Sequence, residues 1–595
     1  MDGGLTAAAP PLSFSGRRWV ARACDTRAAA LIAQAHGLPE PLARLIAVRG
    51  IAPADLDRHL TPRLRDWLPD PSVLPGMDRL AERLADAVRR GETVAVFGDY
   101  DVDGAAATAL MRRFLEAVGG RAVHAVPDRL RDGYGPNVTA FRALADAGAQ
   151  VILCVDCGSA APDPIADIAP RANVLVLDHH RVEAAPVAAL AHVNPTLDTA
   201  SGLDHLCAAG LAFLAAVATN RVLREAGWPR TLDAGGLLDL VDLVAIAAVA
   251  DVVRLTGVNR AFVYRGLPLL TARGRPGIKA LAAAAGIDPL APITEKECGW
   301  VLGPRINAGG RIGQSDSGAL LLLEEDPEKA TARAEALHAL NTERRQLEAA
   351  TTEAAIEQLA DRRPGVDRGL ALAVVEDAHE GVVGISAARL REAYDAPAIV
   401  LSRAHDGALK GSARSVPGFD IGHAIIAARQ AGILVKGGGH GMAGGLTIEE
   451  SRLAEFVAFM DGEIGKTEYA RIGVVSQADA RLTLAEFTVA GLRGMDRMRP
   501  FGTANEEPRI VLAGAVLQDI RVLKEIHFKL VLEDRGVTVD ALMWNAANLP
   551  IAREIREAIG SRVDVYGTGS INAFRGKETP QIVISDIRLT PGVLL

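Results

Sequence analysis

The sequence predicts an α/β protein with four parts: a domain built on a parallel sheet, a long connecting helix, a second α/β domain and a C-terminal β-barrel. Three short apolar runs without alternation (residues 93–98, 150–155 and 173–177) are typical of buried parallel strands, and helical stretches separate them. After about Gly473 the pattern changes to short alternating runs, which predicts an all-β barrel such as an OB fold.

Length and composition set the class of protein. A chain of 595 residues is too long for one core, and 49% apolar with 23% charged residues is ordinary for a globular protein. The net charge of −8 counts weakly against a nucleic-acid binder. A basic groove can nevertheless lie on an acidic body, and carboxylates that bind cations also contribute to a negative total.

The cysteines and the apolar segments indicate in which cellular compartment the protein is found. An odd number of scattered cysteines favours a reducing cytosol: Cys24, Cys154, Cys157, Cys207 and Cys298. The C-x-x-C at 154–157 lacks a second pair at zinc spacing, so we expect buried thiols. We find no signal-peptide pattern, and the most apolar segments are too short to span a bilayer, so a soluble cytoplasmic protein is expected.

The domain boundaries follow from changes in pattern. Residues 326–364 begin with Asp326-Pro327, a good helix start, and contain few breakers, which predicts a helix that joins two domains or, alternatively, lies within one. The predicted parts are an N-terminal helical segment, the first α/β domain, this helix, the second α/β domain and the barrel, at residues 1–70, 71–325, 326–364, 365–465 and 466–595.

A cluster of acids follows the first predicted strand. Asp99, Asp101 and Asp103 are spaced to point together from an extended strand end, and a divalent cation would relieve their repulsion. Gly104 is expected to let the backbone turn into the next helix. A calcium loop is the alternative, but Leu110 stands where its bidentate glutamate is expected.

Further polar residues end other apolar elements. Asp156 follows the second strand, Asp178, His179 and His180 follow the third, and Asp251 ends a later apolar run. Many oxygen ligands with one or two imidazoles favour Mn²⁺ or Mg²⁺ over zinc. Two such ions, about 3.5–4 Å apart, suit phosphoester cleavage.

These motifs resemble those of the DHH phosphoesterases: D-Y-D-x-D-G at 99–104, V-D-C-G at 155–158 and D-H-H at 178–180. The similarity to the RecJ family within that superfamily spans nearly the whole chain, through segments 49–51, 74–78, 132–135, 303–311, 381–385, 439–443 and 500–502. The resemblance identifies the two α/β regions as a DHH domain and a DHH-associated domain, with an OB-type domain after them.

The resemblance also implies roles. Metal ligands would be Asp99, Asp101, Asp103, Asp156, His179 and Asp251, with Asp156 bridging two ions. Asp178 would orient His179, His180 would contact the scissile phosphate and Arg305 would stabilise its charge. Substrate-binding residues would be Arg129, Tyr134, Asn307, Arg311, Ser412, Arg414 and His440, of which Ser412 and Arg414 resemble a grip on a terminal 5′ phosphate.

The sequence departs from the family pattern in three places. Phe97 stands where some relatives have a histidine, so Asp99 is a possible substitute ligand. Ala413 replaces the middle glycine of Gly-Ser-Gly-Arg-Ser, which would matter only if that glycine needs a positive φ. Residues 504–508 also differ from the usual start of the OB segment.

The resemblance implies a metal-dependent exonuclease that digests single-stranded DNA from the 5′ end, in recombination and repair. Implied partners are single-stranded DNA, a single-strand-binding protein and a helicase, and we expect a monomer without membrane contact. Two alternatives stay open: a DHH phosphodiesterase for oligoribonucleotides or cyclic dinucleotides, and a non-catalytic single-strand-binding scaffold that has lost metal ligands.

Overall fold

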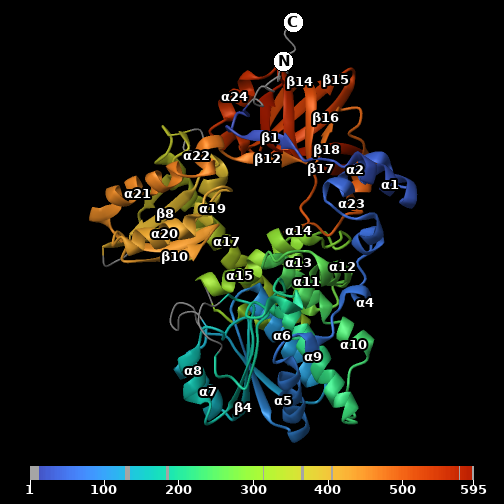
Figure 1. Cartoon of the computed structure of the whole chain (residues 1–595), viewed down its shortest axis with the longest axis vertical. Coiled ribbons are helices and arrows are strands. Elements are labelled where there is room, and N and C mark those ends of the chain that lie inside the picture. Colours follow the sequence, from blue (N-terminus) through green and yellow to red (C-terminus); the bar gives the residue numbers. More distant parts are fainter. Residues whose placement is uncertain are drawn as a thin grey trace, which may run out of the picture. The chain divides into compact units, whose positions relative to one another are not determined.

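The computed structural model describes residues 12–127, 135–181, 187–312, 314–362, 367–403, 407–574 and 576–591 (Figure 1). Contacts group the chain into two compact units. The first unit comprises Asp57–Arg344 and Arg499–Glu506, and the second comprises Met1–Leu56, Arg345–Met498 and Glu507–Leu595. Each unit is described by itself below.

The first unit is built on a parallel sheet. Its strands are β2 (Thr93–Gly98), β3 (Arg121–Ala125), β4 (Ala149–Val155), β5 (Asn173–Leu177) and β6 (Ala191–Val193), in the order β3-β2-β4-β5-β6. Every neighbouring pair is parallel. Sheets of this kind bind ligands beyond the carboxyl ends of their strands, which makes that edge the place to seek chemistry.

Helices cover both faces of this sheet (Figure 1). On one face lie α5 (Met77–Arg90), α6 (Val102–Ala117) and α9 (Ala208–Glu225), packed on side chains such as Val96 and Leu153. On the other face lie α7 (Val138–Asp146) and α8 (Pro162–Ile168), packed on the alternate side chains, such as Ile152 and Val176. Because both faces are buried, the strands carry the continuous apolar runs that predict them.

The remaining helices of the first unit surround this core. They are α4 (Leu64–Trp67), α10 (Ala234–Leu238), α11 (Val241–Ala250), α12 (Gly257–Ala272), α13 (Pro276–Ala284), α14 (Glu295–Glu297), α15 (Gly303–Ile312) and α16 (Ser317–Leu323). A π-helical turn, Cys298–Leu302, joins α14 to α15. The short α3 (Leu56–Leu60) and the long α17 (Pro327–Glu357) continue from one unit into the other, so the predicted long helix is confirmed.

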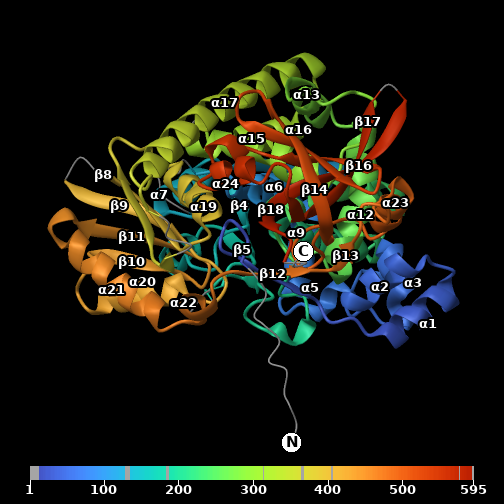
Figure 2. The ribbon, with the colours of Figure 1, turned by 90° about the horizontal axis from the view of Figure 1, so that it is seen from above.

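The second unit contains a mixed sheet of order β10-β11-β9-β8-β7. Its strands are β7 (Ala371–Val375), β8 (Ala398–Arg403), β9 (Ala408–Arg414), β10 (Lys436–His440) and β11 (Ala443–Glu449). Helix α19 (Val383–Tyr394) packs on one face, while α20 (Ile421–Gln430) and α21 (Leu453–Gly465) pack on the other (Figure 2). Helix α22 (Glu468–Ile472) follows them.

The C-terminal part of the second unit is a closed barrel. Strands β14 (Arg509–Leu523), β15 (His527–Asp534), β16 (Val537–Met543), β18 (Lys577–Leu589) and β17 (Arg562–Phe574) pair in that order, and β17 pairs back onto β14. Strand β13 (Ala480–Leu482) pairs in parallel with β14, and α23 (Val489–Asp496) and α24 (Ala552–Glu557) flank the strands. Strand β1 (Arg18–Ala21) pairs with β12 (Val475–Ala478), after which come α1 (Thr26–His36) and α2 (Glu40–Val48).

The predicted fold class is confirmed: a parallel-sheet domain, a long helix, a second α/β domain and a β-barrel. The predicted domain boundaries stay a prediction. Buried thiols are confirmed at Cys154 and Cys157, both free. Within the described ranges, no helix is both long and apolar enough to cross a membrane.

Candidate functional site

Four separate parts of the chain meet at the carboxyl edge of the parallel sheet. Strand β4 lies between β2 and β5, so the segments that follow these strands are neighbours. Those segments carry Asp99–Asp103, Asp156 and Asp178–His180. Asp251 instead follows a helix, as the residue that caps the C-terminus of α11.

The acidic segment after β2 differs from its prediction. Asp101 caps α6 by accepting a hydrogen bond from the Gly104 N–H at 3.0 Å, so the helix begins at Val102 and Asp103 lies in its first turn rather than on an extended strand end. The predicted turn at Gly104 is therefore wrong. A Cβ there would lie 2.5 Å from the carbonyl oxygen of Asp99, so close packing requires this glycine.

Asp103 is held in place by the start of α9. Its carboxylate oxygens accept hydrogen bonds from the N–H groups of Ala208 at 2.6 Å and Ala209 at 2.8 Å. The positive end of the helix dipole favours the negative charge at this position. Asp103 is 1% exposed, and its Oδ2 lies 3.5 Å from Nε2 of His179.

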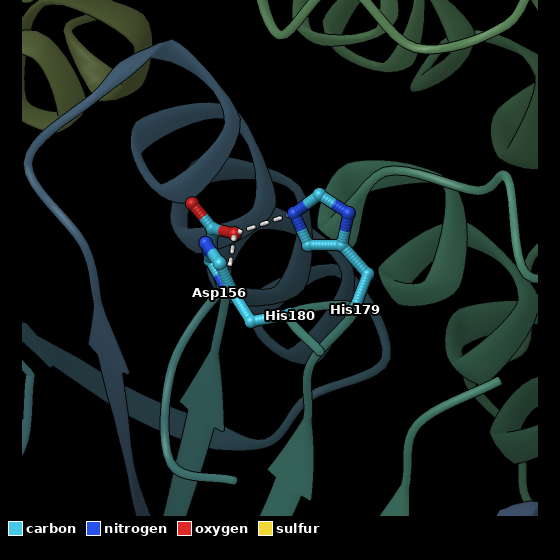
Figure 3. A group of neighbouring side chains, drawn as sticks. All are labelled: Asp156, His179 and His180. Atoms are coloured by element: carbon cyan, nitrogen blue, oxygen red, sulfur yellow. Dashed lines mark hydrogen bonds and ion pairs between the residues drawn. The ribbon is translucent and has the colours of Figure 1, made fainter. Parts of the chain in front are cut away.

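Asp156 lies at the centre of the cluster. It is 1% exposed, has a left-handed backbone with φ of 62°, and its N–H donates to the carbonyl of Leu177 at 2.9 Å. Its Oδ1 is 3.1 Å from Nε2 of His179 and 3.9 Å from Nδ1 of His180 (Figure 3). This single oxygen therefore faces both imidazoles.

The two histidines point in different directions. Nε2 of His179 faces Asp103, Asp156 and also Asp251, whose Oδ2 is 3.7 Å away. The ring of His180 instead has its Nδ1 2.8 Å from Oδ1 of Asp178. His180 is also the more exposed of the two, with 46% of its side chain accessible.

The role of Asp178 in orienting His179 stays a prediction; in this structure the ring that the Asp178 side chain contacts is that of His180. Oδ1 of Asp178 accepts from the backbone N–H groups of His179 at 2.8 Å and His180 at 3.1 Å, and it also pairs with the His180 ring. The same oxygen that accepts from both backbone N–H groups also contacts the His180 ring, because that ring lies over the Asp178 carboxylate. Asp178 thus contacts His179 only through the backbone.

The carboxylates of the cluster repel one another. Burial, followed by Asp101, Asp103, Asp99 and Asp251, raises the pKa of Asp156 well above its ordinary value. Burial, followed by Asp103 and Asp101, raises the pKa of Asp251 to about 8. Burial also raises the pKa of Asp103, although the nearby His179 opposes this. Such a group of buried acids is stable as anions only with cations among them.

The Asp178–His180 pair behaves in the opposite way. The hydrogen bond to Asp178 raises the pKa of His180 to about 9, against the effect of burial. Burial alone would raise the pKa of Asp178, but the hydrogen bond from His180 and its charge lower it below the ordinary value. His180 is therefore a cation at neutral pH and is held by an anion.

The cluster fits metal ions. Three groups place one ligand atom per residue within 4.8 Å of each other: Asp156, His179 and His180; Asp103, His179 and Asp251; Asp99, Asp101 and Asp156. Oxygen-rich ligands with one or two imidazoles are the donor set of Mn²⁺ or Mg²⁺. Because Asp156 and His179 each belong to two groups, the residues present fit two adjacent divalent cations.

One predicted catalytic residue, Arg305, and two predicted substrate-binding residues, Asn307 and Arg311, lie on α15. Arg305 is 8% exposed, and its guanidinium donates to the carbonyl of Val301 at 2.7 Å and to Nδ1 of His338 at 3.2 Å. The side-chain oxygen of Asn307 accepts from the N–H of Val102 at 2.9 Å, so it ties α15 to the first turn of α6. Arg311 lies in the last turn of α15.

A second polar group lies on the mixed sheet of the second unit. A Cβ at Gly384 would be 3.1 Å from the Arg414 guanidinium and 3.3 Å from the Ser412 hydroxyl, so these predicted residues are neighbours. Burial, followed by Arg391, lowers the pKa of Arg414. His440 lies opposite Ala443, which is itself opposite Arg414. Sequence reasoning missed Arg391, which no motif distinguishes from other helical arginines.

The departures from the family pattern have clear placements. Phe97 packs edge-on against Phe141 at 5.3 Å in the core behind the sheet, so it does not take a ligand's place. Ala413 lies within β9, opposite Gly444, in a backbone that any residue adopts.

Predicted residues Arg129 and Tyr134 lie outside the described residues.

Family models match three stretches of the chain. They are the DHH family N-terminal domain at residues 93–245, the DHHA1 domain at residues 367–466 and the RecJ OB domain at residues 478–586. The matches correspond to the parallel-sheet domain, the mixed-sheet domain and the barrel.

Relatives that match over most of their length are RecJ exonucleases. The single-stranded-DNA-specific exonuclease RecJ of Dickeya dadantii is 35% identical over 572 residues, covering 92% of this chain and 96% of that protein. The protein of the same description from Escherichia coli is 34% identical over 577 residues, with the same coverage of 92% and 96%.

A solved structure shares the fold. The crystal structure of RecJ from Thermus thermophilus in complex with Mn²⁺ has a TM-score of 0.77 and 27% identity, and the match covers 97% of this chain and 80% of that chain. The Mg²⁺ complex from the same organism has a TM-score of 0.71 at 27% identity, and the match covers 97% of this chain and 78% of that chain.

Proposed function

Because the chain belongs to the RecJ family, we propose that it is a single-stranded-DNA exonuclease that hydrolyses phosphodiester bonds from the 5′ end with two divalent cations. The observation that carries the proposal is the cluster around Asp156, in which every metal ligand expected from the sequence is present. A non-catalytic scaffold would have no use for these buried and mutually repelling acids.

The metal ligands would be divided between two sites. Asp99 and Asp101 would hold one ion, Asp103, His179 and Asp251 would hold the other, and Asp156 would bridge them. Divalent cations supply, when bound, activation of water and neutralisation of charge on the scissile phosphate. This donor set suits Mn²⁺ or Mg²⁺, the ions in the two Thermus thermophilus RecJ structures.

The chain's own residues complete the site. Asp178 holds Nδ1 of His180 and raises the pKa of that ring to about 9, so the imidazolium would donate a hydrogen bond to a phosphate oxygen. Arg305 would stabilise the charge that develops on that phosphate. Asn307, which is predicted to bind substrate, would also act indirectly. Its side chain holds the backbone of Val102 at the start of the helix that carries Asp103.

The proposed polarity depends on the second unit. Ser412 and Arg414 would bind the terminal 5′ phosphate, and the lowered pKa of Arg414 reflects a half-buried cation beside Arg391 that an anion would stabilise. The OB-type domain would bind the following strand. Further proposals are a cytoplasmic monomer in recombination and repair, with single-strand-binding protein and a helicase as partners.

Digestion of end-labelled DNA tests the proposed function. We expect Mn²⁺-dependent release of nucleotides from single strands with a free 5′ end, little release from 5′-blocked strands, and little from duplex DNA. A 3′ block should have no effect on the initial rate. Preferential digestion from the 3′ end would contradict the polarity, and cleavage of dinucleotides alone would favour a small-substrate phosphodiesterase.

Metal binding should stabilise the protein in a pH-dependent way. A carboxyl with a raised pKa favours the fold while protonated; this contribution is complete below the unfolded pKa of about 3.9 and is lost as pH rises through the folded value. That folded value is about 8 for Asp251, so the metal-free Tm should fall between pH 5.5 and 7.5. Metal needs the deprotonated ligands, so the Mn²⁺-induced rise in Tm should be larger at pH 7.5.

Thermal unfolding with and without Mn²⁺ measures this effect. The expected stabilisation is about 2.7 kcal/mol when free Mn²⁺ is roughly 100 times its dissociation constant. Monovalent salt at equal ionic strength is the control, because it screens the acids without occupying the site. An equal response to both salts would contradict a specific metal site.

Replacing Arg414 with alanine should weaken the grip on the terminal phosphate. The loss of a charge-assisted hydrogen bond costs about 1.5–3 kcal/mol, so KM for a 5′-phosphorylated strand should rise about 10- to 100-fold. A strand with a 5′ hydroxyl should be affected much less. Arg403→Ala, on β8 of the same sheet and paired with Glu376 and Glu450, is the control. Equal losses on both strands would contradict the assignment.

A further inference from the structure

A hydrogen-bond network lies behind His180, away from the metal cluster. Its members come from two parts of the sheet. Ser159 lies after β4, His192 lies on β6, and Asn194 directly follows β6. Ser159 is 1% exposed and Asn194 is 6% exposed. Sequence reasoning missed all three, although Asn194 directly follows strand β6, as Asp156 and Asp178 directly follow β4 and β5.

Asn194 uses every hydrogen-bonding position of its amide. Its Nδ2 donates to the backbone carbonyl of His180 at 2.9 Å and to the Ser159 hydroxyl at 2.9 Å. Its Oδ1 accepts from the backbone N–H of Thr196 at 2.9 Å and from the Thr196 hydroxyl at 2.7 Å. A carbonyl can only accept and an N–H can only donate, so these partners fix which way the amide points.

Ser159 connects this amide to the carboxylate that holds the His180 ring. The Ser159 N–H donates to Oδ2 of Asp178 at 2.9 Å. Its hydroxyl, which accepts from Asn194, is also 2.8 Å from Nε2 of His192. Asn194, Ser159 and Asp178 therefore form a continuous buried path.

The consequence is that His180 is fixed at three points. Asp178 holds its backbone N–H and its ring Nδ1, and Asn194 holds its carbonyl. With both sides of the residue restrained, the ring cannot rotate or shift without breaking one of these hydrogen bonds.

We infer that Asn194, supported by Ser159, is a positioning residue that sets His180 at the distance from the scissile phosphate that hydrolysis needs. The inference rests on the proposed nuclease function and adds to it a residue that acts through His180. The hydrogen bonds of Asn194 go to Ser159, His180 and Thr196, so its replacement leaves the contacts of Asp103, Asp156 and Asp251 as they are.

The test replaces the amide by a carboxylate of the same shape. Asn194→Asp puts a second acceptor 2.9 Å from the His180 carbonyl oxygen. The hydrogen bond that holds this carbonyl is therefore replaced by repulsion. Asn220→Asp is the matched control. Asn220 is 3% exposed, donates to the Leu232 carbonyl at 2.8 Å and accepts from the Leu232 N–H at 2.9 Å, so it suffers the same chemical loss away from the site.

We expect Asn194→Asp to lower kcat about 10- to 100-fold, since a small misplacement of a reacting group has that effect. KM for single-stranded DNA and the Mn²⁺ dissociation constant from calorimetry should match wild type. Asn220→Asp should lower Tm but keep kcat. Ser159→Ala removes the hydroxyl that accepts from Asn194 and should lower kcat by a smaller factor, about 2- to 10-fold. This second variant tests the inference if Asn194→Asp does not fold.

Wild-type kcat in the folded variants would overturn the inference, and so would a loss of Mn²⁺ affinity that accounts for the loss of kcat. In the second case Asn194 would act on the metal ions rather than on His180. An inactive wild-type enzyme would instead contradict the proposed function, so the two failures are distinguishable.

Discussion

Replacing Asp156 with asparagine is expected to reduce nuclease activity to background. Its Oδ1 lies 3.1 Å from Nε2 of His179 and 3.9 Å from Nδ1 of His180, and Asp156 belongs to two of the three groups that could hold a metal ion. The amide keeps the shape but removes the negative charge that would be shared by two cations. End-labelled single-stranded DNA with saturating Mn²⁺ measures the loss.

The same substitution should make the metal-free protein more stable. Burial and four neighbouring carboxylates raise the pKa of Asp156, which means that its charge opposes folding at neutral pH. The Tm of Asp156→Asn without metal should therefore exceed that of wild type, and its response to Mn²⁺ should be lost. A protein that is more stable but inactive cannot be inactive through misfolding.

Asp242→Asn is the control with the opposite expectation. Asp242 is also buried in the first unit, but it pairs with Arg275, whose guanidinium lies 2.5 Å away. Breaking a buried pair costs about 3–5 kcal/mol, so this variant should lose stability and keep its activity. An active Asp156→Asn variant would exclude Asp156 as the bridging ligand.

The sequence predicts most of this site because of how parallel sheets are built. The apolar runs before Asp99, Asp156 and Asp178 identify buried strands, and the carboxyl ends of neighbouring parallel strands meet. That rule brings the acids together without any knowledge of side-chain geometry. Asp251 could be included only as the end of an apolar run, and the structure places it at the C-terminal end of a helix.

What the sequence could not predict depends on short elements and local geometry. Strand β3, Arg121–Ala125, is a partly exposed edge strand, and β6, Ala191–Val193, has too few residues for a pattern. Because β6 is too short for a pattern, the sequence does not indicate that Asn194 follows a strand. Which histidine pairs with Asp178 is likewise set by the backbone after β5, where the N–H groups of both residues turn toward one carboxylate oxygen.

The two adjacent histidines should give different losses when each is replaced by alanine. Nε2 of His179 faces three carboxylates at 3.1–3.7 Å, so His179→Ala should weaken Mn²⁺ binding and lower activity as a result. His180 has its Nδ1 held by Asp178, so its loss removes a cation from the substrate side. His180→Ala should keep Mn²⁺ affinity and lower kcat about 10²- to 10³-fold, as the removal of one charge-stabilising donor does elsewhere.

Raising the Mn²⁺ concentration separates these two explanations. Activity of His179→Ala should recover in part at high Mn²⁺, because mass action refills a weakened site, whereas His180→Ala should stay impaired at every concentration. His192→Ala is a third comparison, since His192 lies close by but reaches His180 only through Ser159 and Asn194. Recovery of His180→Ala by Mn²⁺ would mean that His180 is itself a ligand, as its 3.9 Å separation from Asp156 allows, and that the pairing with Asp178 serves to orient a metal-bound imidazole.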